Sequence, residues 1–244
     1  MMDTVTTTQR HLPSQLRGLP CIRAEVAHVI APGKATPSLE GPVFDRHGNF
    51  YCCLTAPNDT YVKKISPDGS ISDFFHSDSG MTVGLVFHQD GRCFAADMLR
   101  NCIRILSADG KLLEELPLQY EGRNLRPDCM VFDRKGDLLF TDLSGTFRDP
   151  IGGVYRLTQD SDYHELSLYV GNLASPDGIT LSPDGKSLWV SECSSNSVLR
   201  FLLDGQGNPR IAQHTPLQAY RNSGVSNVDT HAMDENGYLY LGIM

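Results

Sequence analysis

Pro127-Asp128-Cys129-Met130-Val131-Phe132 is one of five short segments that recur along the chain with the same layout. Each is an apolar, strand-like run that starts at a fixed position, which we call the slot, and reaches a turn glycine eight residues later. The slots and their glycines are Glu40 and Gly48, Val83 and Gly91, Asp128 and Gly136, Asp177 and Gly185, and Asp229 and Gly237. Four of the five slots therefore hold a carboxylate.

The slots are separated by 43, 45, 49 and 52 residues, and each interval contains the same order of features. A first strand ends in an Asp/Gly turn, a second apolar strand such as 138–141 follows, and a third such as 153–157 comes after a polar gap. Asp-Gly turns between short strands are typical of antiparallel hairpins. Four strands in a repeat of about 40–50 residues are typical of a β-propeller blade. A β-sandwich is the alternative, but unrelated sandwich strands would not recur at this interval.

We therefore predict an all-β fold, a six-bladed β-propeller that is incomplete at the C-terminus. About four and a half blades fit into the chain, because the fifth unit stops after its second strand, over 238–243. An open ring leaves unpaired strand edges and an apolar blade face in water. The expected organisation is an N-terminal lead-in over 1–38 and a truncated propeller domain over 39–244. Residues 22–30 of the lead-in could form one strand, and its part near 26–30 would complete the last blade.

Charge and cysteine usage restrict the class of partner and the compartment. The formal net charge of −8 argues against a phosphate-binding surface, so nucleic acid is excluded as a partner. The seven cysteines include no C-x-x-C pair, and we expect buried free thiols in a reducing cytosol. The N-terminus has no basic stretch followed by an apolar run, and no apolar run approaches the ~20 residues of a membrane span. We predict a soluble, cytoplasmic protein with no membrane partner.

The slot carboxylates predict a metal site. The first strand of each propeller blade runs beside the central channel, so Glu40, Asp128, Asp177 and Asp229 should meet at one depth. Unpaired carboxylates at short range repel one another unless a cation lies between them. A hard ion with oxygen ligands fits, and Ca²⁺ tolerates irregular geometry. Ca²⁺ is expected, with other divalent ions such as Mg²⁺, Mn²⁺ or Zn²⁺ left open.

Turn capping is the structural alternative, since acids at strand starts commonly cap turns. One such acid would carry no information, but four at the same offset from a turn glycine favour the metal ring. A second set of acids, Asp97, Asp142 and Glu192, ends the second strands and is expected to anchor turns. His231 follows Asp229 by two residues, and a hydrogen-bonded core histidine is favoured over one beneath the metal.

Several of these segments together resemble a known family. They are 39–45, 128–133, 140–142, 152–155, 177–179 with 188–190, and Asp229 ahead of Asp234. In this order they are similar to the senescence-marker-protein/gluconolactonase/luciferin-regenerating-enzyme family of six-bladed propellers, and look closest to its drug-responsive lactonases from bacteria. The resemblance runs from about residue 39 to the end of the chain.

The resemblance implies a Ca²⁺ ion low in the channel, held by Glu40 and by Asp128, Asp177 and Asp229. It also implies that Asp229 is the general base or nucleophile. One departure stands out: the position of Asp177 is usually asparagine in the family. The additional charge is expected to tighten metal binding.

The expected function is that of a Ca²⁺-dependent hydrolase, a lactonase or carboxylic-ester hydrolase whose partner is a small lactone or ester. Water attacks a carbonyl polarised by the ion, and Asp229 removes its proton. The rival from another class is a non-catalytic propeller that binds Ca²⁺ or a ligand. A third reading is another reaction on this scaffold, such as phosphotriester hydrolysis or a strictosidine-synthase-like condensation.

Overall fold

Every regular element in the described part of the chain is a β-strand, as the sequence predicts. The computed structural model describes residues 25–30, 38–159, 164–210, 216–224 and 226–244. The chain divides into two units, Met1–Gly33 and Lys34–Met244, and all strands lie in the second. Over the described residues we find no helix of the length and apolarity needed to cross a membrane.

Four antiparallel sheets of four consecutive strands follow one another along the chain. The first contains β1 (Ser38–Phe44), β2 (Phe50–Ala56), β3 (Asp59–Ile65) and β4 (Ile71–Ser77). The second contains β5 (Thr82–Phe87), β6 (Cys93–Asp97), β7 (Cys102–Leu106) and β8 (Leu112–Pro117). The third contains β11 (Pro127–Phe132), β12 (Leu138–Asp142), β13 (Gly152–Gln159) and β14 (His164–Leu173). The fourth contains β15 (Pro176–Leu181), β16 (Ser187–Glu192), β17 (Ser197–Leu202) and β18 (Leu217–Arg221).

Two smaller sheets complete the described strands. A hairpin of β9 (Gln119–Tyr120) and β10 (Arg123–Asn124) lies between the second and third sheets in the sequence. The strands β19 (Val228–Met233) and β20 (Leu239–Ile243) form a two-stranded sheet that begins at the fifth slot.

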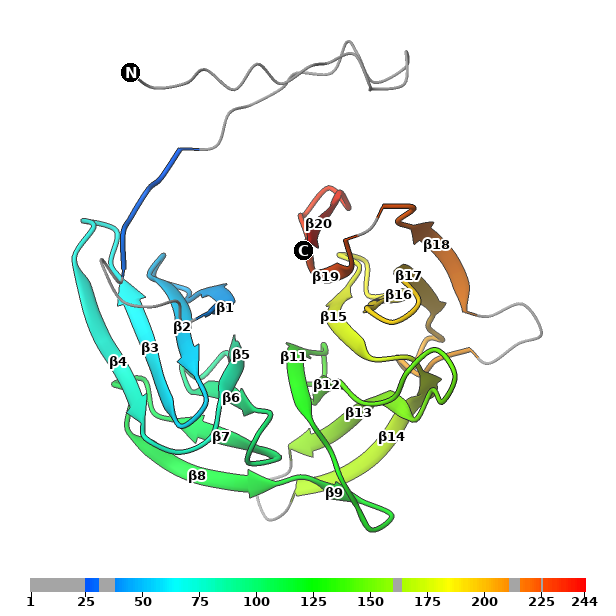
Figure 1. Cartoon of the computed structure of the whole chain (residues 1–244), viewed down its shortest axis with the longest axis horizontal. Helices are drawn as coiled ribbons and strands as arrows, with labels where there is room; N and C mark the ends of the chain where they lie inside the picture. The colour runs from blue at the N-terminus through cyan, green and yellow to red at the C-terminus, as the bar shows by residue number, and fades with distance from the viewer. Residues whose placement is uncertain (1–24, 31–37, 160–163, 211–215, 225) are drawn as a thin grey trace. The chain divides into compact units, whose positions relative to one another are not determined.

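The sheets are arranged as the blades of a β-propeller. Their first strands contact one another in chain order, β1 with β5, β5 with β11, β11 with β15, and β15 with β19. Figure 1 shows these strands innermost and β4, β8, β14 and β18 outermost. The prediction of a propeller with about four and a half blades is confirmed for the described residues.

The recurring Asp/Gly turns have a simple local cause. In the third blade the Asp133 carboxylate accepts hydrogen bonds from the backbone N–H groups of Lys135 (2.8 Å) and Asp137 (3.0 Å). Gly136 adopts a positive φ of 87°, which glycine reaches without steric cost. The same side chain-to-backbone bonds close the turns at Asp45 and Asp234. The turn sequence thus fixes the hairpin geometry, independently of the rest of the fold.

Apolar clusters fill the spaces between neighbouring blades. Successive strand residues point to opposite faces, so Leu138 and Phe140 pack toward the second blade while Leu139 packs toward the fourth. All three side chains are fully buried. The third blade therefore buries both faces, which explains why its central strands are nearly all apolar.

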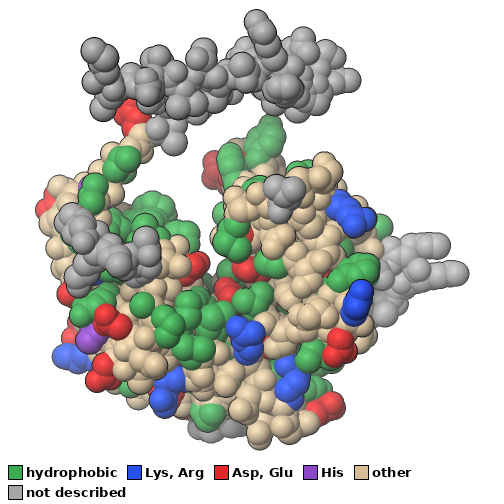
Figure 2. Space-filling view, in the orientation of Figure 1, with side chains coloured by type: hydrophobic (Ala, Val, Ile, Leu, Met, Phe, Trp, Pro, Cys, Tyr) green, Lys and Arg blue, Asp and Glu red, His purple; other side chains and the backbone are tan. Residues whose placement is uncertain are grey.

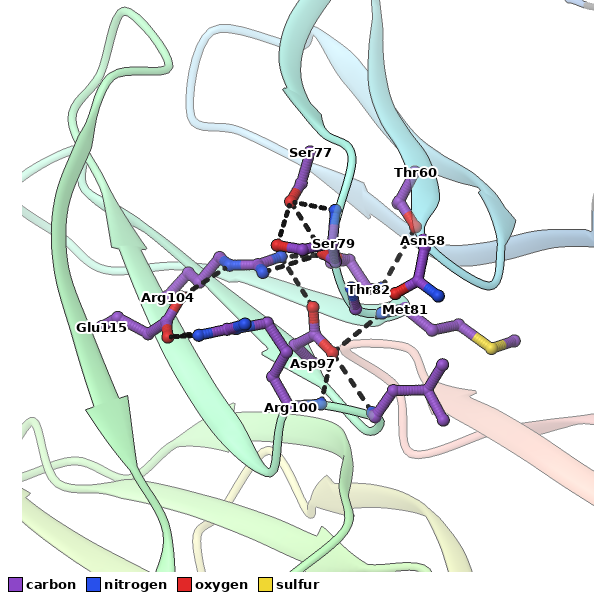
Figure 3. Close-up of polar contacts among 12 residues, drawn as sticks. Asn58, Thr60, Ser77, Ser79, Met81, Thr82, Asp97, Arg100, Arg104 and Glu115 are labelled. Carbon is purple, nitrogen blue, oxygen red and sulfur yellow. Dashed lines mark hydrogen bonds and ion pairs between the residues drawn. The ribbon is translucent and has the colours of Figure 1, made fainter.

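Buried acids at the ends of the second strands tie each blade to the segment that leads into its first strand. Asp97 accepts a hydrogen bond from the Met81 N–H at 2.8 Å, and Figure 3 shows this anchor with its neighbours. Asp142 accepts from the Arg126 N–H and Glu192 from the Ala174 N–H, each at 2.8 Å. The predicted anchoring role of these acids is confirmed.

The lead-in differs from the expectation. Residues 25–30 form no strand, and the side chains of Val26 and Val29 are exposed. Residues 25–30 therefore do not form the expected strand in this structure, and the closing of the last blade stays a prediction. Residues 22–24 lie outside the described residues. The division between a lead-in over 1–38 and a domain over 39–244 stays a prediction.

Candidate functional site

Each slot residue lies at an irregularity in the pairing of its innermost strand. In β11 the ladder passes from Pro127 opposite Asp142 to Met130 opposite Phe140, so two residues face one. The same shift occurs over 177–178 in β15 and over 229–230 in β19, and a related one follows Glu40 in β1. A β-bulge bends the strand and re-aims a side chain. The bulges thus accompany every slot acid.

The four slot carboxylates line one cavity of about 630 Å³. Electrostatic interactions link Glu40 with Asp128 and Asp229, and Asp177 with Asp128 and Asp229, so the four acids form a closed ring. In the space-filling view of Figure 2, acidic side chains are visible at the walls of the central hollow. The structure therefore brings together all four residues that the sequence singled out.

Burial and mutual repulsion raise the pKa of these acids. Burial raises the pKa of Asp128 well above its ordinary value, and the neighbouring charge of Asp177 adds to the effect. Burial, followed by the charge of Asp229, raises the pKa of Asp177 to about 7. The pKa of the half-buried Glu40 is raised by burial and by Asp229. The arrangement of acids is electrostatically strained, and a cation between them would relieve the strain.

Two thiols flank Asp177 within the ring. The Cys129 sulphur lies 3.7 Å from Asp177 Oδ1, and the Cys193 sulphur lies 3.3 Å from Asp177 Oδ2. Burial and the nearby carboxylates raise the pKa of both thiols, so they act as S–H donors. The six cysteines within the described residues are free, as predicted.

From the sequence, these cysteines are expected only to be buried thiols. The one available signal was that Cys129 directly follows a slot acid, whereas Cys193 has no such mark. Ligand atoms of Asp128, Cys129 and Asp177 lie within 4.8 Å of one another, as do those of Asp177, Cys193 and Asp229. Asp177 belongs to both groups and is the central member of the ring.

His231 lies on β19 between the fourth and fifth sheets and lines the same cavity. A Cβ atom added to Gly178 would lie 2.8 Å from the backbone nitrogen of His231, so the two strands approach closely only because residue 178 is glycine. Neither ring nitrogen has a hydrogen-bond partner of good geometry among the described residues. Burial lowers the pKa of His231 to about 4, against a small opposing effect of the Trp189 backbone. His231 lies in the core as predicted, with the Trp189 backbone as a weak hydrogen-bond partner of its ring.

The remaining cavity wall is largely apolar. Met81, Met98 and Leu143 contribute side chains to it, and Val83 occupies the second slot. A site of this kind suits a small, mostly uncharged molecule that presents one polar group to the acids.

Comparisons with known proteins agree with the fold. The pattern of the SMP-30/Gluconolactonase/LRE-like region matches residues 40–244. Lactonase drp35 of Staphylococcus saprophyticus is 30% identical over 236 residues, which cover 95% of this chain and 71% of that protein. The chain covers 63% of the drp35 protein of Staphylococcus haemolyticus, so it spans about two thirds of the length of these relatives.

Solved structures share the architecture at lower identity. A gluconolactonase from Xanthomonas campestris superposes with a TM-score of 0.69 at 20% identity, covering 83% of this chain and 69% of that one. The calcium-binding protein regucalcin from Agrobacterium tumefaciens gives a TM-score of 0.66 at 17% identity, covering 85% and 68%. At these identities the likeness shows the fold alone. The family pattern matches residues 40–244, and drp35 is 30% identical over most of this chain. These two findings show that the chain belongs to the SMP-30/gluconolactonase/LRE-like family.

Proposed function

We propose that the chain carries the site of a lactonase, a hydrolase that opens a small lactone with the help of a divalent cation, Ca²⁺ first among the candidates. The observation that carries the proposal is the convergence of Glu40, Asp128, Asp177 and Asp229, from four different blades, on one cavity. Membership of the family and the drp35 relatives support the choice of reaction.

The donor set fits a hard divalent cation. Three aspartates and one glutamate supply only oxygen ligands, which Ca²⁺ prefers. The raised pKa of Asp177 and Asp128 reflects repulsion that a bound cation would replace with attraction. The thiols of Cys129 and Cys193 lie beside the same carboxylates and would admit a softer ion such as Zn²⁺. A bound cation would polarise the lactone carbonyl and stabilise the oxyanion.

The chain's own residues divide the remaining work. Asp229, partly buried in the cavity wall, accepts a proton from the attacking water. The apolar wall formed by Met81, Met98 and Leu143 binds the ring of the substrate and excludes bulk water. Asp177, flanked by two S–H donors, keeps a fixed orientation beside Asp229.

The test is a hydrolysis screen of the chain with aliphatic lactones, an aryl ester and a phosphotriester, each with CaCl₂ and with EDTA. We expect lactone opening in CaCl₂ and its loss in EDTA. Turnover that EDTA leaves unchanged would contradict the metal requirement. Turnover of the phosphotriester but of no lactone or ester would show that the protein is a phosphotriesterase and not a lactonase.

The alternative is a non-catalytic propeller that binds Ca²⁺ or another ligand in the same cavity. It is favoured by one observation, the shared fold with a protein described as calcium-binding. If no substrate is turned over while CaCl₂ raises the melting temperature, this alternative replaces the lactonase.

A further inference from the structure

Two buried hydroxyl groups connect the three aspartates of the ring. The Thr141 hydroxyl, at the end of β12, donates to the backbone carbonyl of Asp177 at 2.6 Å. The Thr141 hydroxyl oxygen in turn accepts a hydrogen bond from the Cys129 N–H at 3.1 Å. Thr141 thus links the bulge that carries Asp128 in one blade to the backbone of Asp177 in the next.

Ser191 repeats this arrangement one blade later. Its hydroxyl oxygen accepts a hydrogen bond from the Gly178 N–H at 2.7 Å and donates to the Asp229 backbone carbonyl. The Thr141 and Ser191 side chains are both fully buried. Together the two hydroxyls make one hydrogen-bonded path through the backbones of the three aspartate bulges.

The bulges give each hydroxyl a backbone group to bind at these two places. Thr141 faces the pair 128–129, and Ser191 faces the pair 177–178. Where two residues oppose one, a backbone N–H loses its ladder partner, and an unpaired buried N–H is costly. The hydroxyl oxygen accepts a hydrogen bond from that N–H, and the hydroxyl proton is donated to a backbone carbonyl of the neighbouring blade.

The second blade provides an internal comparison. There the slot holds Val83, and Ala96 stands before the strand-end Asp97, as Thr141 stands before Asp142 and Ser191 before Glu192. The blade without a slot carboxylate has no hydroxyl at this position, and in the fifth sheet, at the end of the ring, Gly242 faces the bulge of Asp229. Turn formation does not require the hydroxyl, since Asp97 anchors its turn without one.

We propose that Thr141 and Ser191 are positioning residues that set the spacing of Asp128, Asp177 and Asp229 and so determine the affinity of the ring for a divalent cation. This inference rests on the metal site of the proposed function. A cation needs its ligands at fixed separations, and the hydroxyls fix the backbones from which these ligands extend. Groups that hold metal ligands in place typically change affinity by about 10–100-fold when removed.

The test is calorimetric titration of CaCl₂ into the metal-free chain of residues 1–244, compared with the variants Thr141→Val, Ser191→Ala and Thr141→Ser. We expect Thr141→Val and Ser191→Ala to raise the Kd for Ca²⁺ by about 10–100-fold. Thr141→Ser keeps the hydroxyl and should restore an affinity close to that of the unchanged chain. Ser191→Ala removes a single oxygen and decides the question if Thr141→Val does not fold.

Thr55→Val is the matched control. Thr55 is almost as deeply buried as Thr141, its hydroxyl lies 3.0 Å from that of Thr60 within the first blade, and it does not line the cavity. The control should lose stability but keep its Ca²⁺ affinity. Equal affinities in the unchanged chain, Thr141→Val and Ser191→Ala would overturn the inference and leave the proposed metal site intact. Absence of Ca²⁺ binding in the unchanged chain would overturn the metal site itself.

Discussion

Arg104 and Asp97 form an ion pair of 2.6 Å in which both side chains are almost completely excluded from solvent. The Arg104 guanidinium also donates to the carbonyl of Ser79 at 3.0 Å and to Glu115 at 3.2 Å (Figure 3). Ser79 precedes β5, whereas Arg104 lies on β7. The pair therefore joins an outer strand of the second blade to the segment that leads into its innermost strand.

Asp97→Ala should destabilise the fold strongly, because it leaves the Arg104 charge buried without its partner. Removing one member of a buried pair typically costs about 3–5 kcal/mol in the free energy of unfolding. Urea unfolding measures the loss. The control is Asp73→Ala, an exposed acid that pairs with the partly buried Lys63 and whose loss should cost less than about 1 kcal/mol. Equal losses in the two variants would contradict this account.

The stability of the metal-free chain should fall as the pH rises toward neutrality. The pKa of Asp177 is about 7 in the folded chain, above the ~3.9 of an unfolded aspartate. A raised folded pKa gives stability that is fully present below about pH 4 and is lost as the pH rises through about 7. Melting temperatures in EDTA between pH 6 and 8 should therefore decline. Asp177→Asn should flatten that decline, and a variant as steep as the unchanged chain would contradict the assignment.

Addition of CaCl₂ should reverse the same decline. A cation in the ring favours ionised carboxylates, so its stabilising effect should grow as the pH rises from 6 to 8. The measurement is the shift in melting temperature on adding CaCl₂ at each pH. A shift that is equal at every pH would mean that the cation binds elsewhere.

His231→Met should stabilise the chain, most clearly in mild acid. The folded pKa of about 4 lies below the ~6.5 of an unfolded histidine, so the imidazole costs stability as the pH falls below about 6.5. Met130 occupies the corresponding place two residues after the third-blade acid, so the fold accepts methionine there. Thermal melting from pH 5 to 7 tests the effect. A variant that melts lower than the unchanged chain would indicate a partner for the ring.

Asp229→Asn should abolish turnover and leave the fold intact. Loss of a general base typically costs about 10²–10⁴-fold in rate. The assay belongs at saturating CaCl₂, so that weaker cation binding is separated from the loss of the base. Glu235→Gln, an exposed acid of the following turn, is the matched control and should retain full activity. Undiminished lactone opening by Asp229→Asn would refute the role of Asp229.

The fold and the ring of slot acids could be predicted from the sequence because both arise from local patterns repeated along the chain. Asp133 closes its turn with Lys135 and Gly136, all within four residues, and the same chemistry recurs in other blades. The constant distance from turn glycine to slot then places every acid at one register of its innermost strand. The strand predicted over 22–30 had no such repeated signal, and residues 25–30 do not form it.

The sequence by itself determined the propeller repeat and the set Glu40, Asp128, Asp177 and Asp229, because the eight-residue spacing from slot to glycine and the turn chemistry act between near neighbours. Only the tertiary structure decided what surrounds these acids. The Cys129 sulphur lies 3.6 Å from the Thr230 hydroxyl, a residue 101 positions away, and Thr141 bonds the next blade. Such contacts depend on how blades pack, and packing distances between segments remote in sequence leave no periodic trace in the chain.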